Sequence, residues 1–385
     1  MITITFVSNF LNHHQTPVAE ELFKKLGTSY HFISTEPTPE SFLQSGYPNC
    51  ENIEYNVLSY KSQEDYTNAL QLVLKSEIVI IGAHNDSIIK FTQERIKSGK
   101  PLLKYSERWH KEWKSYLFLP YHILNGNIWR NHISLRNKPV YLLCAGAFVS
   151  NDCNLIGAYP NKRFKWGYFT SAKELQIENI LNDKKNKKTR IVWVGRFIDW
   201  KHPELPVKLA YYLKNNGYDF QIDMIGAGEL LNNTQALINN LNVADCVNIL
   251  GTMPNHKVIE EMRQSHIFLF TSDRQEGWGA VLNEAMSNGC TVVASNKIGA
   301  VPYLLSEPNT GMIFKSGNID SLQKKVTVLL TNRELCNDMA RNAYRVIRDV
   351  WSPENASDNL LELCQAICDN YLELLKIRKG PCSKA

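Results

Sequence analysis

The sequence predicts an α/β protein with two doubly wound domains, each built from a parallel sheet and covering helices. The chain has 385 residues, which is enough for two or three domains of ordinary size. Short apolar runs of strand length alternate with helical patterns through both halves, and repeated β-α units imply parallel sheets. A polar, lysine-rich stretch at residues 182–188 interrupts the alternation and is the expected linker.

The first half supplies the elements of an N-terminal domain, expected over residues 1–185. Residues 3–8 form an apolar strand, and Pro17 suits the first position of a helix over 17–26. Further strands are expected at residues 30–34, 78–82, 102–106 and 140–143, and further helices at 63–75 and 87–98.

A C-terminal domain is expected over residues 186–352, followed by a tail over 353–385. The expected strands are 190–195, 220–225, 247–250, 267–271 and 291–294, and the helices are 203–215, 230–241, 257–265 and 279–288. Residues 353–379 have the pattern of a long amphipathic helix that packs back on the N-terminal domain. Because such sheets bind ligands beyond their carboxyl strand ends, we expect a site in a cleft between the two domains.

Composition and charge exclude several classes of protein. The chain is 44% hydrophobic and 21% charged, which is ordinary globular usage, and no apolar run reaches the roughly 18 residues that span a bilayer. The net charge of +5 is too small to indicate nucleic-acid binding. The first residues lack the features of a secretory signal, and nine scattered cysteines indicate reduced thiols, so we expect a cytoplasmic protein.

One segment, residues 104–138, concentrates basic and aromatic side chains. Its basic residues are Lys104, Arg108, Lys111, Lys114, Arg130, Arg136 and Lys138, against Glu107 and Glu112. Its large aromatic residues include Trp109, Trp113, Tyr116, Phe118, Tyr121 and Trp129. Such a mixture suits peripheral contact with an anionic membrane surface, and a helical hairpin with buried rings is the alternative.

The most informative stretch is residues 271–299, where a predicted strand leads through a loop into a helix. Glu276 lies in the loop, Gly277 and Gly279 allow close approach of the backbone, and the helix begins near Ala280. Free amides at a helix start suit a phosphate. Glu284 follows one turn later, so both carboxylates can point into one cleft, although a surface helix with solvated acids is the alternative.

A second strand end carries two cations. Gly195 and Arg196 close the strand at 190–195, and Lys201 follows in the loop before a helix. The planar fork of an arginine and the point charge of a lysine together suit a diphosphate leaving group. A glycine pair, Gly226 and Gly228, follows the strand at 220–225, which is also compatible with a simple tight turn.

Together these segments resemble the retaining glycosyltransferases of family 4, bacterial polysaccharide-biosynthesis type, over residues 191–314. The resemblance rests on VGR with its following lysine, IGAGE, NILG and above all EGWGAVLNEAMSNGCTVVAS with Glu276 and Glu284 spaced as E-x7-E. It implies the GT-B fold, with two Rossmann-like domains facing a central cleft. It also implies that Glu276 contacts the transferred sugar and Glu284 the ribose, while Arg196 and Lys201 stabilise the diphosphate. The remaining nucleotide-sugar contacts that it implies are Gly195, Gly226, Gly228, Thr252, Gly277, Gly279, Ala280 and Val281.

The N-terminal half resembles this family less. Where members carry a Gly-Gly loop after the first strand, this chain has residues 9–15, which puts the phosphate contact of that loop in doubt. His84 resembles the family's histidine that contacts the donor sugar or supports the chemistry. Acceptor contacts are expected from Asn12, His13, His14, Glu107 and Arg108; a surface loop for the histidines and a structural ion pair for Glu107 and Arg108 are the alternatives.

The chemistry expected from the resemblance is a retaining transfer from a UDP- or GDP-sugar to a glycan or lipid-linked oligosaccharide. By analogy with bacterial members of the family, we expect this transfer to serve cell-surface polysaccharide biosynthesis at the inner face of the cytoplasmic membrane. No DxD, HExxH or GxSxG motif is present, so we expect protein cations to replace a metal, and no cofactor. A non-hydrolysing sugar-nucleotide epimerase and a catalytically silent nucleotide-sugar-binding protein are the alternative functions. The sequence leaves the base, sugar, acceptor and oligomeric state open.

Overall fold

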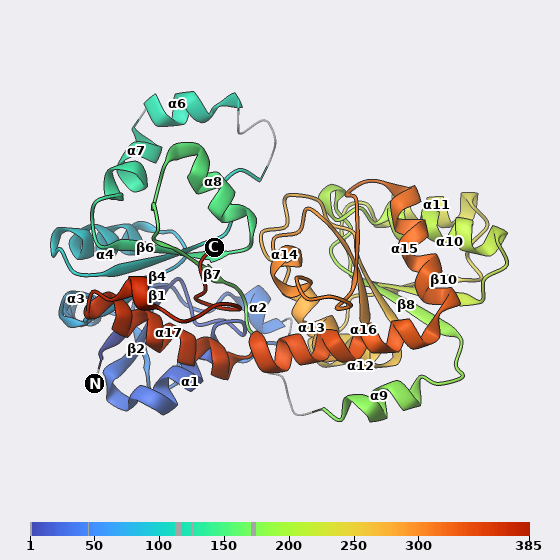
Figure 1. Ribbon diagram of the computed structural model, residues 1–385, viewed down its shortest axis with the longest axis horizontal. Helices are drawn as coiled ribbons and strands as arrows, with labels where there is room; N and C mark the ends of the chain where they lie inside the picture. The colour runs from blue at the N-terminus through green and yellow to red at the C-terminus, as the bar shows by residue number, and fades with distance from the viewer. Residues whose placement is uncertain (1, 45, 112–116, 125, 171–174) are drawn as a thin grey trace. The chain divides into compact units, whose positions relative to one another are not determined.

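The structure is a computed structural model that describes residues 2–44, 46–111, 117–124, 126–170 and 175–385. It divides into two compact units: unit 1 comprises residues 1–171 and 350–385, and unit 2 comprises residues 172–349. Each unit is a parallel sheet flanked by helices (Figure 1), so the predicted α/β class with two Rossmann-like domains is confirmed. The lysine-rich stretch expected as the linker lies inside unit 2, after α9 (Ile177–Asp183).

Unit 1 contains a seven-stranded sheet in the order β3-β2-β1-β4-β5-β6-β7, among the residues described, and all neighbours pair in parallel. The strands are β1 (Ile4–Ser8), β2 (Tyr30–Ser34), β3 (Asn56–Leu58), β4 (Ile78–Ile81), β5 (Leu102–Ser106), β6 (Val140–Ala145) and β7 (Arg163–Trp166). The helices of this unit are α1 (Thr16–Leu26), α2 (Glu40–Gln44), α3 (Gln63–Lys75), α4 (Asp86–Lys97), α6 (Leu119–Leu124), α7 (Asn127–Asn131), α8 (Phe148–Ile156) and α17 (Pro353–Cys368).

Unit 2 contains a six-stranded parallel sheet in the order β10-β9-β8-β11-β12-β13 within its described part. The strands are β8 (Thr189–Val194), β9 (Phe220–Ile225), β10 (Val247–Gly251), β11 (Ile267–Phe270), β12 (Thr291–Ser295) and β13 (Met312–Phe314). Besides α9, the helices are α10 (Glu204–Asn215), α11 (Leu231–Asn240), α12 (Asn255–Gln264), α13 (Val281–Ser287), α14 (Val301–Leu304), α15 (Ile319–Thr331) and α16 (Arg333–Arg345).

Local sequence explains why the predicted elements form. Every residue of β4 is buried, as expected for an apolar run in a sheet covered on both faces. The Ser62 hydroxyl accepts a hydrogen bond from the Asp65 amide (3.0 Å) at the start of α3. The Asn85 side chain does the same for the Ile88 amide (2.9 Å) at the start of α4, which fixes the loop after β4.

The apolar runs in the sequence do not predict three of the strands, β3, β7 and β13. Each has only three or four residues, and β7 alternates the cationic Arg163 and Lys165 with buried Phe164 and Trp166. Such short alternating segments become strands because the sheet beside them offers hydrogen-bond partners. The pattern of the residues alone does not distinguish them from loops.

The C-terminal tail returns to unit 1, but its helix is shorter than predicted. Helix α17 ends at Cys368 rather than at residue 379, and Asn370 has a left-handed backbone (φ 56°) that stops the helix. Lys25 of α1 donates to Ser357 and Asp358 of α17, both at 2.6 Å. The last residues then pair with β7, since Cys382 donates to Lys165 (2.7 Å) and thereby covers the sheet edge.

The order of the strands indicates where each sheet can bind a ligand. In unit 1 the chain reverses direction across the sheet between β1 and β4, and in unit 2 it does so between β8 and β11. Open parallel sheets bind ligands at the carboxyl ends of the strands on either side of this switch point. The loops after these four strands are therefore where ligands are expected to bind.

Candidate functional site

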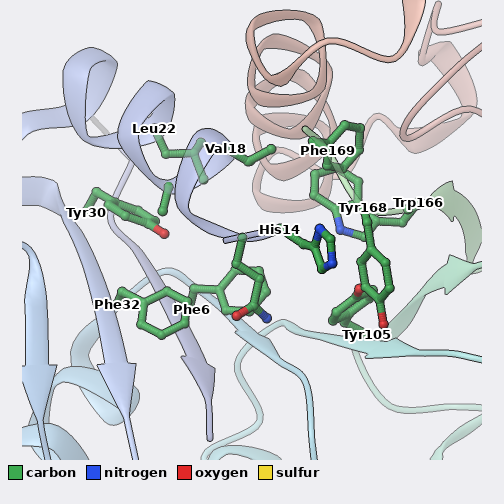
Figure 2. A pocket seen from close by; sticks show the side chains of 13 residues that line it. Phe6, His14, Val18, Leu22, Tyr30, Phe32, Tyr105, Trp166, Tyr168 and Phe169 are labelled. Carbon is green, nitrogen blue, oxygen red and sulfur yellow. The ribbon is translucent and has the colours of Figure 1, made fainter. Parts of the chain in front are cut away.

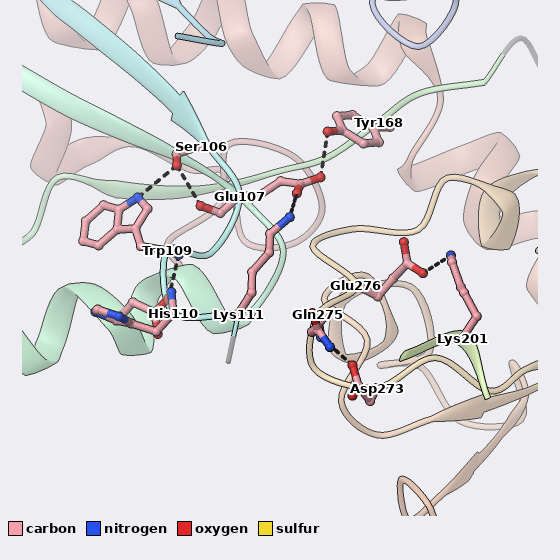
Figure 3. A network of polar contacts seen from close by, with 11 residues as sticks. Ser106, Glu107, Trp109, His110, Lys111, Tyr168, Lys201, Asp273, Gln275 and Glu276 are labelled. Carbon is pink, nitrogen blue, oxygen red and sulfur yellow. Dashed lines mark hydrogen bonds and ion pairs between the residues drawn. The ribbon is translucent and has the colours of Figure 1, made fainter. Parts of the chain in front are cut away.

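In unit 2 the two switch-point loops are joined by an ion pair. We call residues 195–203, between β8 and α10, the Lys201 loop, and residues 271–280, between β11 and α13, the Glu276 loop. Lys201 Nζ donates to Glu276 Oε2, and each side chain is only 12% exposed (Figure 3). The sequence predicted both residues as parts of one site, and the structure brings them together.

Hydrogen bonds, two of them to backbone carbonyls, join these two loops. The Thr271 hydroxyl donates to the Lys201 carbonyl (2.6 Å) and accepts from the indole N–H of Trp193 (2.8 Å). The Asp273 amide donates to the Trp200 carbonyl (2.9 Å). The Lys201 ammonium also lies 4.5 Å from the centroid of the Trp200 ring, within the range of a cation–π contact.

Two glycines allow the backbone to approach closely at this site. Gly279 has φ 91°, and a Cβ there would lie 2.4 Å from the Phe270 ring. Gly226 has φ 134°, and a Cβ there would lie 2.0 Å from the Gly195 carbonyl oxygen. Gly228 is similarly close to Phe197, so the predicted Gly226 and Gly228 pair packs against the Lys201 loop rather than forming only a turn.

The other predicted nucleotide-sugar contacts lie around the start of α13. Gly277 is buried, Ala280 immediately precedes α13, and Val281 is its first residue. Glu284 lies in the first turn, and burial raises the pKa of its carboxyl to about 7, while a hydrogen bond from Asn255 of α12 opposes the rise. Thr252 is exposed directly after β10.

Arg196 occupies the exposed side of the Lys201 loop. Its guanidinium carbon lies 5.7 Å from the centroid of the Trp200 ring, on which Lys201 also lies. Trp200 is a residue that sequence reasoning missed, although a tryptophan between two predicted diphosphate cations is a signal for it. The two cations therefore share one aromatic support.

Unit 1 contains a cavity of about 370 Å³ at its own switch point. Three of the predicted residues line it: His84, Asn12 and Glu107. The remaining lining residues, which were not among the predicted site residues, are Ser8, Asn9, Gln15, Ala83, Tyr105, Ser106 and Tyr168. Most of them lie at or just beyond the carboxyl ends of β1, β4 and β5, and this position is the signal that would have found them.

Glu107 lies within a polar network at the edge of this cavity. Its carboxylate accepts from the Tyr168 hydroxyl (2.8 Å) and pairs with the Lys111 ammonium (2.9 Å), as Figure 3 shows. The neighbouring Arg108 has a different role. It is 7% exposed and pairs with the fully buried Asp152 at 3.7 Å, which is the structural ion pair considered as the alternative for Arg108.

The residues after β1 form a folded aromatic cluster rather than a surface loop. The Asn12 side chain accepts from the His14 amide (3.0 Å), the His13 ring stacks on Tyr47 (3.8 Å between centroids), and His14 stacks on Tyr168 (5.1 Å). Burial lowers the pKa of His13 to about 4 and that of His14 to about 3, so both rings are neutral at pH 7.

A second cavity lies beneath His14, between α1 and the strands (Figure 2). It is lined mostly by apolar residues such as Val18, Leu22 and Phe32. Its volume of about 20 Å³ is close to that of a single water site, so it is too small for a sugar.

The basic aromatic segment is only partly described, because Glu112, Trp113, Lys114 and Tyr116 lie outside the described residues. In the described part, one face packs on the core through Leu119, Ile123 and Ile128. The other face is exposed: Leu117, Phe118, Tyr121 and Trp129 are each 54–65% accessible to solvent. Both the helical packing and an outward apolar face are therefore present.

The described part of the chain contains neither a metal-ligand cluster nor a membrane-spanning helix. No group of three or more His, Cys, Asp or Glu side chains there is placed to hold a metal ion. None of its helices combines the length and the apolar character needed to cross a bilayer.

Comparison with known proteins gives a family match to unit 2. Residues 176–346 match the family model "Glycosyl transferases group 1". The chain is 28% identical over 147 residues to the amylovoran biosynthesis glycosyltransferase AmsK of Erwinia amylovora, covering 37% of this chain and 36% of that protein. It is 27% identical to the N-acetylgalactosamine-N,N'-diacetylbacillosaminyl-diphospho-undecaprenol 4-alpha-N-acetylgalactosaminyltransferase of Campylobacter jejuni, covering 44% and 45%. These alignments span less than half the length of either relative.

Solved structures match nearly the whole chain. A glycosyltransferase from Rickettsia africae superposes with a TM-score of 0.67 over 96% of this chain and 99% of that one, at 17% identity. Anabaena Alr3699/HepE in complex with UDP gives 0.69 over 95% and 100%, at 12% identity. The chain therefore has the GT-B fold.

Proposed function

We propose that this protein is a retaining glycosyltransferase that moves a sugar from a nucleotide-diphosphate sugar to a glycan or lipid-linked acceptor in cell-surface polysaccharide biosynthesis. One observation carries the proposal. The region that matches group 1 glycosyl transferases coincides with unit 2, and Lys201 and Glu276 meet there at the switch point of the sheet. The spacing of Glu276 and Glu284 supports the assignment to family 4.

The donor would bind at the Lys201 and Glu276 loops. As the bond from the sugar to the diphosphate breaks, negative charge grows on the leaving phosphate. Lys201 and Arg196 would stabilise this charge, which is the contribution that a metal makes in other enzymes. Glu276 would hold the sugar and Glu284 the ribose. A hydroxyl oxygen of the acceptor then forms the new bond to the anomeric carbon on the face that the phosphate leaves, and its proton passes to the departing phosphate, so the anomeric configuration is retained.

The acceptor would bind in the 370 Å³ cavity of unit 1. Its lining combines amides, hydroxyls, one carboxylate and tyrosine rings, which together suit the hydroxyl groups and apolar faces of a sugar. His84, in the loop after β4, is one of the lining residues, and by the family resemblance it would contact the donor sugar or support the chemistry.

A lipid-linked acceptor would bring the protein to a membrane surface. The Campylobacter relative is named for a diphospho-undecaprenol acceptor, and the exposed face of Phe118, Tyr121 and Trp129 beside basic residues suits an anionic bilayer. We propose peripheral association at the cytoplasmic face through residues 104–138.

The experiment that tests this function compares thermal stabilisation by UDP, GDP and their common sugar conjugates, without added metal. A ligand that binds only the folded state raises stability according to its concentration and Kd, so the nucleotide that responds identifies the base. We expect a shift in the wild type that is lost in Lys201→Ala. Turnover of the donor only in the presence of acceptor would support transfer. Epimerisation of the donor without acceptor, or binding without turnover, would overturn it.

A further inference from the structure

His202, directly after Lys201 in the Lys201 loop, has a left-handed backbone conformation. It has φ 52° and ψ 57°, which is the left-handed region, and it follows the 3-10 helix at Asp199–Lys201. Few residues with a Cβ adopt this conformation, because the Cβ then lies close to the following carbonyl oxygen. An outlier of this kind next to a site is a reason to ask what its side chain does.

The His202 ring lies between carboxylates from both sides of the site. Its Nδ1 lies 3.1 Å from Glu204 Oε1, at the start of α10. Its Nε2 faces Asp273 Oδ2 of the Glu276 loop at 3.9 Å. The left-handed backbone at residue 202 places the ring in this position, between two loops that backbone contacts already join.

Asp273 also forms backbone hydrogen bonds with both loops of the proposed donor site. Its amide donates to the Trp200 carbonyl (2.9 Å), and its own carbonyl accepts from the Glu276 amide (3.3 Å). Its second carboxylate oxygen accepts from the Gln275 amide (2.8 Å; Figure 3). A shift of Asp273 would therefore shift Glu276 and its contact with Lys201.

Only the protonated ring suits both neighbours. An imidazolium donates from both nitrogens, whereas a neutral imidazole has one nitrogen lone pair that would face a carboxylate. The charged groups around His202 are Asp199, Glu204 with Lys208 of α10, and Asp273. The hydrogen bond to Glu204, together with the charges of Glu204, Asp273 and Asp199, raises the pKa of His202 although partial burial opposes this. The contribution of the charged ring is therefore complete at mildly acid pH and is lost as pH rises through the raised pKa.

We propose that His202 is a positioning residue: as an imidazolium it holds the Glu276 loop against the Lys201 loop, so that the nucleotide sugar binds more tightly when this ring is protonated. The proposal rests on the donor site proposed above, and it adds a dependence of that site on pH. His202 itself need not touch the donor.

The test is the Kd of UDP-glucose and of GDP-mannose, measured by calorimetry between about pH 6 and 8.5, where the charge of a diphosphate diester is constant. We expect wild-type affinity to fall by about fivefold across this range, at the lower end of ordinary coupling between sites. His202→Gly suits the left-handed backbone and should fold, yet it should bind weakly with no such fall. Asp273→Asn should behave in the same way, and His31→Gln, in β2 of unit 1, is the control that should keep the wild-type profile.

Glu284 titrates in the same range, so the decisive quantity is the difference between wild type and His202→Gly. A flat wild-type profile, or an equal fall in His202→Gly, would overturn the proposal. If wild type binds neither nucleotide sugar at any pH, the donor site itself is refuted. In that case the contact between His202 and Asp273 is tested by NMR titration of the His202 ring. A His202 pKa that is unchanged in Asp273→Asn would refute the positioning role of His202.

Discussion

Unit 2 presents charge at its switch point, whereas unit 1 presents neutral polar groups and aromatic rings at the equivalent place. In unit 2, Lys201 and Glu276 form an ion pair, and Arg196 lies beside them on the same tryptophan. In unit 1, Glu107 is the one carboxylate in the described cavity lining, and the side chains of Asn12, Gln15 and Ser8 form a hydrogen-bonded chain.

This difference follows from what each half is proposed to bind. A diphosphate carries concentrated charge, so a few cations and a close backbone supply most of the required stabilisation. A neutral sugar offers many weak hydroxyl contacts, which require a larger number of precisely placed partners. Substitutions should therefore have large effects on few positions in unit 2 and smaller effects spread over many positions in unit 1.

Lys201→Ala should give the largest effect. It removes the cation of the proposed diphosphate site and leaves the Glu276 carboxylate without this partner in a mostly buried position. Because loss of one group that stabilises transition-state charge costs about 10²–10³-fold, we expect kcat/KM to fall by that factor while the far-UV circular dichroism is retained.

The matched control is Lys324→Ala, which removes an exposed lysine from α15 in the same unit. It should change kcat/KM by less than about twofold, as expected for a surface substitution away from the site. Near-wild-type activity of Lys201→Ala, or an equal loss in both variants, would contradict the assignment of the diphosphate site.

The same contrast explains what the sequence could predict. The unit 2 residues come from short contiguous segments at strand ends, and parallel pairing of β8 with β11 brings those ends together. Knowing that both strands are parallel is therefore enough to place Lys201 near Glu276. The geometry of His202 was not predictable, because histidine adopts a left-handed backbone more often than most residues but at only a small fraction of its positions.

The unit 1 cavity was harder to predict because it draws on four separate stretches, residues 8–15, 83–84, 105–107 and 168. Tyr168 follows β7, a strand too short and too polar to be recognised from its pattern. Arg108 shows the opposite difficulty. It follows Glu107 directly, but its partner Asp152 lies on α8, which the apolar pattern did not reveal, so its burial could not be anticipated.

Glu284→Gln tests whether the buried carboxylate of Glu284 lowers the free energy of unfolding when it is charged. Since burial raises the pKa of Glu284 to about 7, the unfolded chain loses this proton first, and stability falls as pH rises from about 4.5 towards 7. Replacement by Gln should therefore raise the free energy of unfolding by about 1–3 kcal/mol at pH 8 and by much less at pH 5. The measurement is urea unfolding at both pH values.

The same variant should bind the donor nucleotide more weakly if Glu284 contacts the ribose. Glu261→Gln, on neighbouring α12, is the control, because it removes a carboxylate that is paired with Arg190. A gain in stability that is equal at the two pH values would contradict the titration argument. Unchanged nucleotide affinity would remove Glu284 from the site.

Glu107→Gln should have a smaller effect, confined to the acceptor. The amide oxygen can still accept from Tyr168, but the variant loses the charge that strengthens hydrogen bonds to sugar hydroxyls and the pair with Lys111. We expect the acceptor KM to rise about tenfold with the Kd of the donor unchanged, because one charge-assisted hydrogen bond is worth about that factor. Glu94→Gln, which breaks an exposed pair with Lys97 on α4, is the control. An equal change in donor affinity would show that the two halves do not divide recognition as proposed.

The smallest effect is expected at the exposed side chains of Phe118, Tyr121 and Trp129 within residues 104–138. These three side chains belong to neither proposed site. Phe118 is 58% exposed, and replacement by Ser should weaken sedimentation with anionic liposomes by about three- to fivefold, since one ring inserted partway into the interface contributes only part of its full burial energy. Leu155→Ser removes a side chain on α8 that is 55% exposed and should leave liposome binding unchanged. If both variants bind equally well, the exposed ring has no membrane role. If Phe118→Ser also slows transfer to a water-soluble acceptor, its contribution lies in the fold of unit 1 rather than at the bilayer.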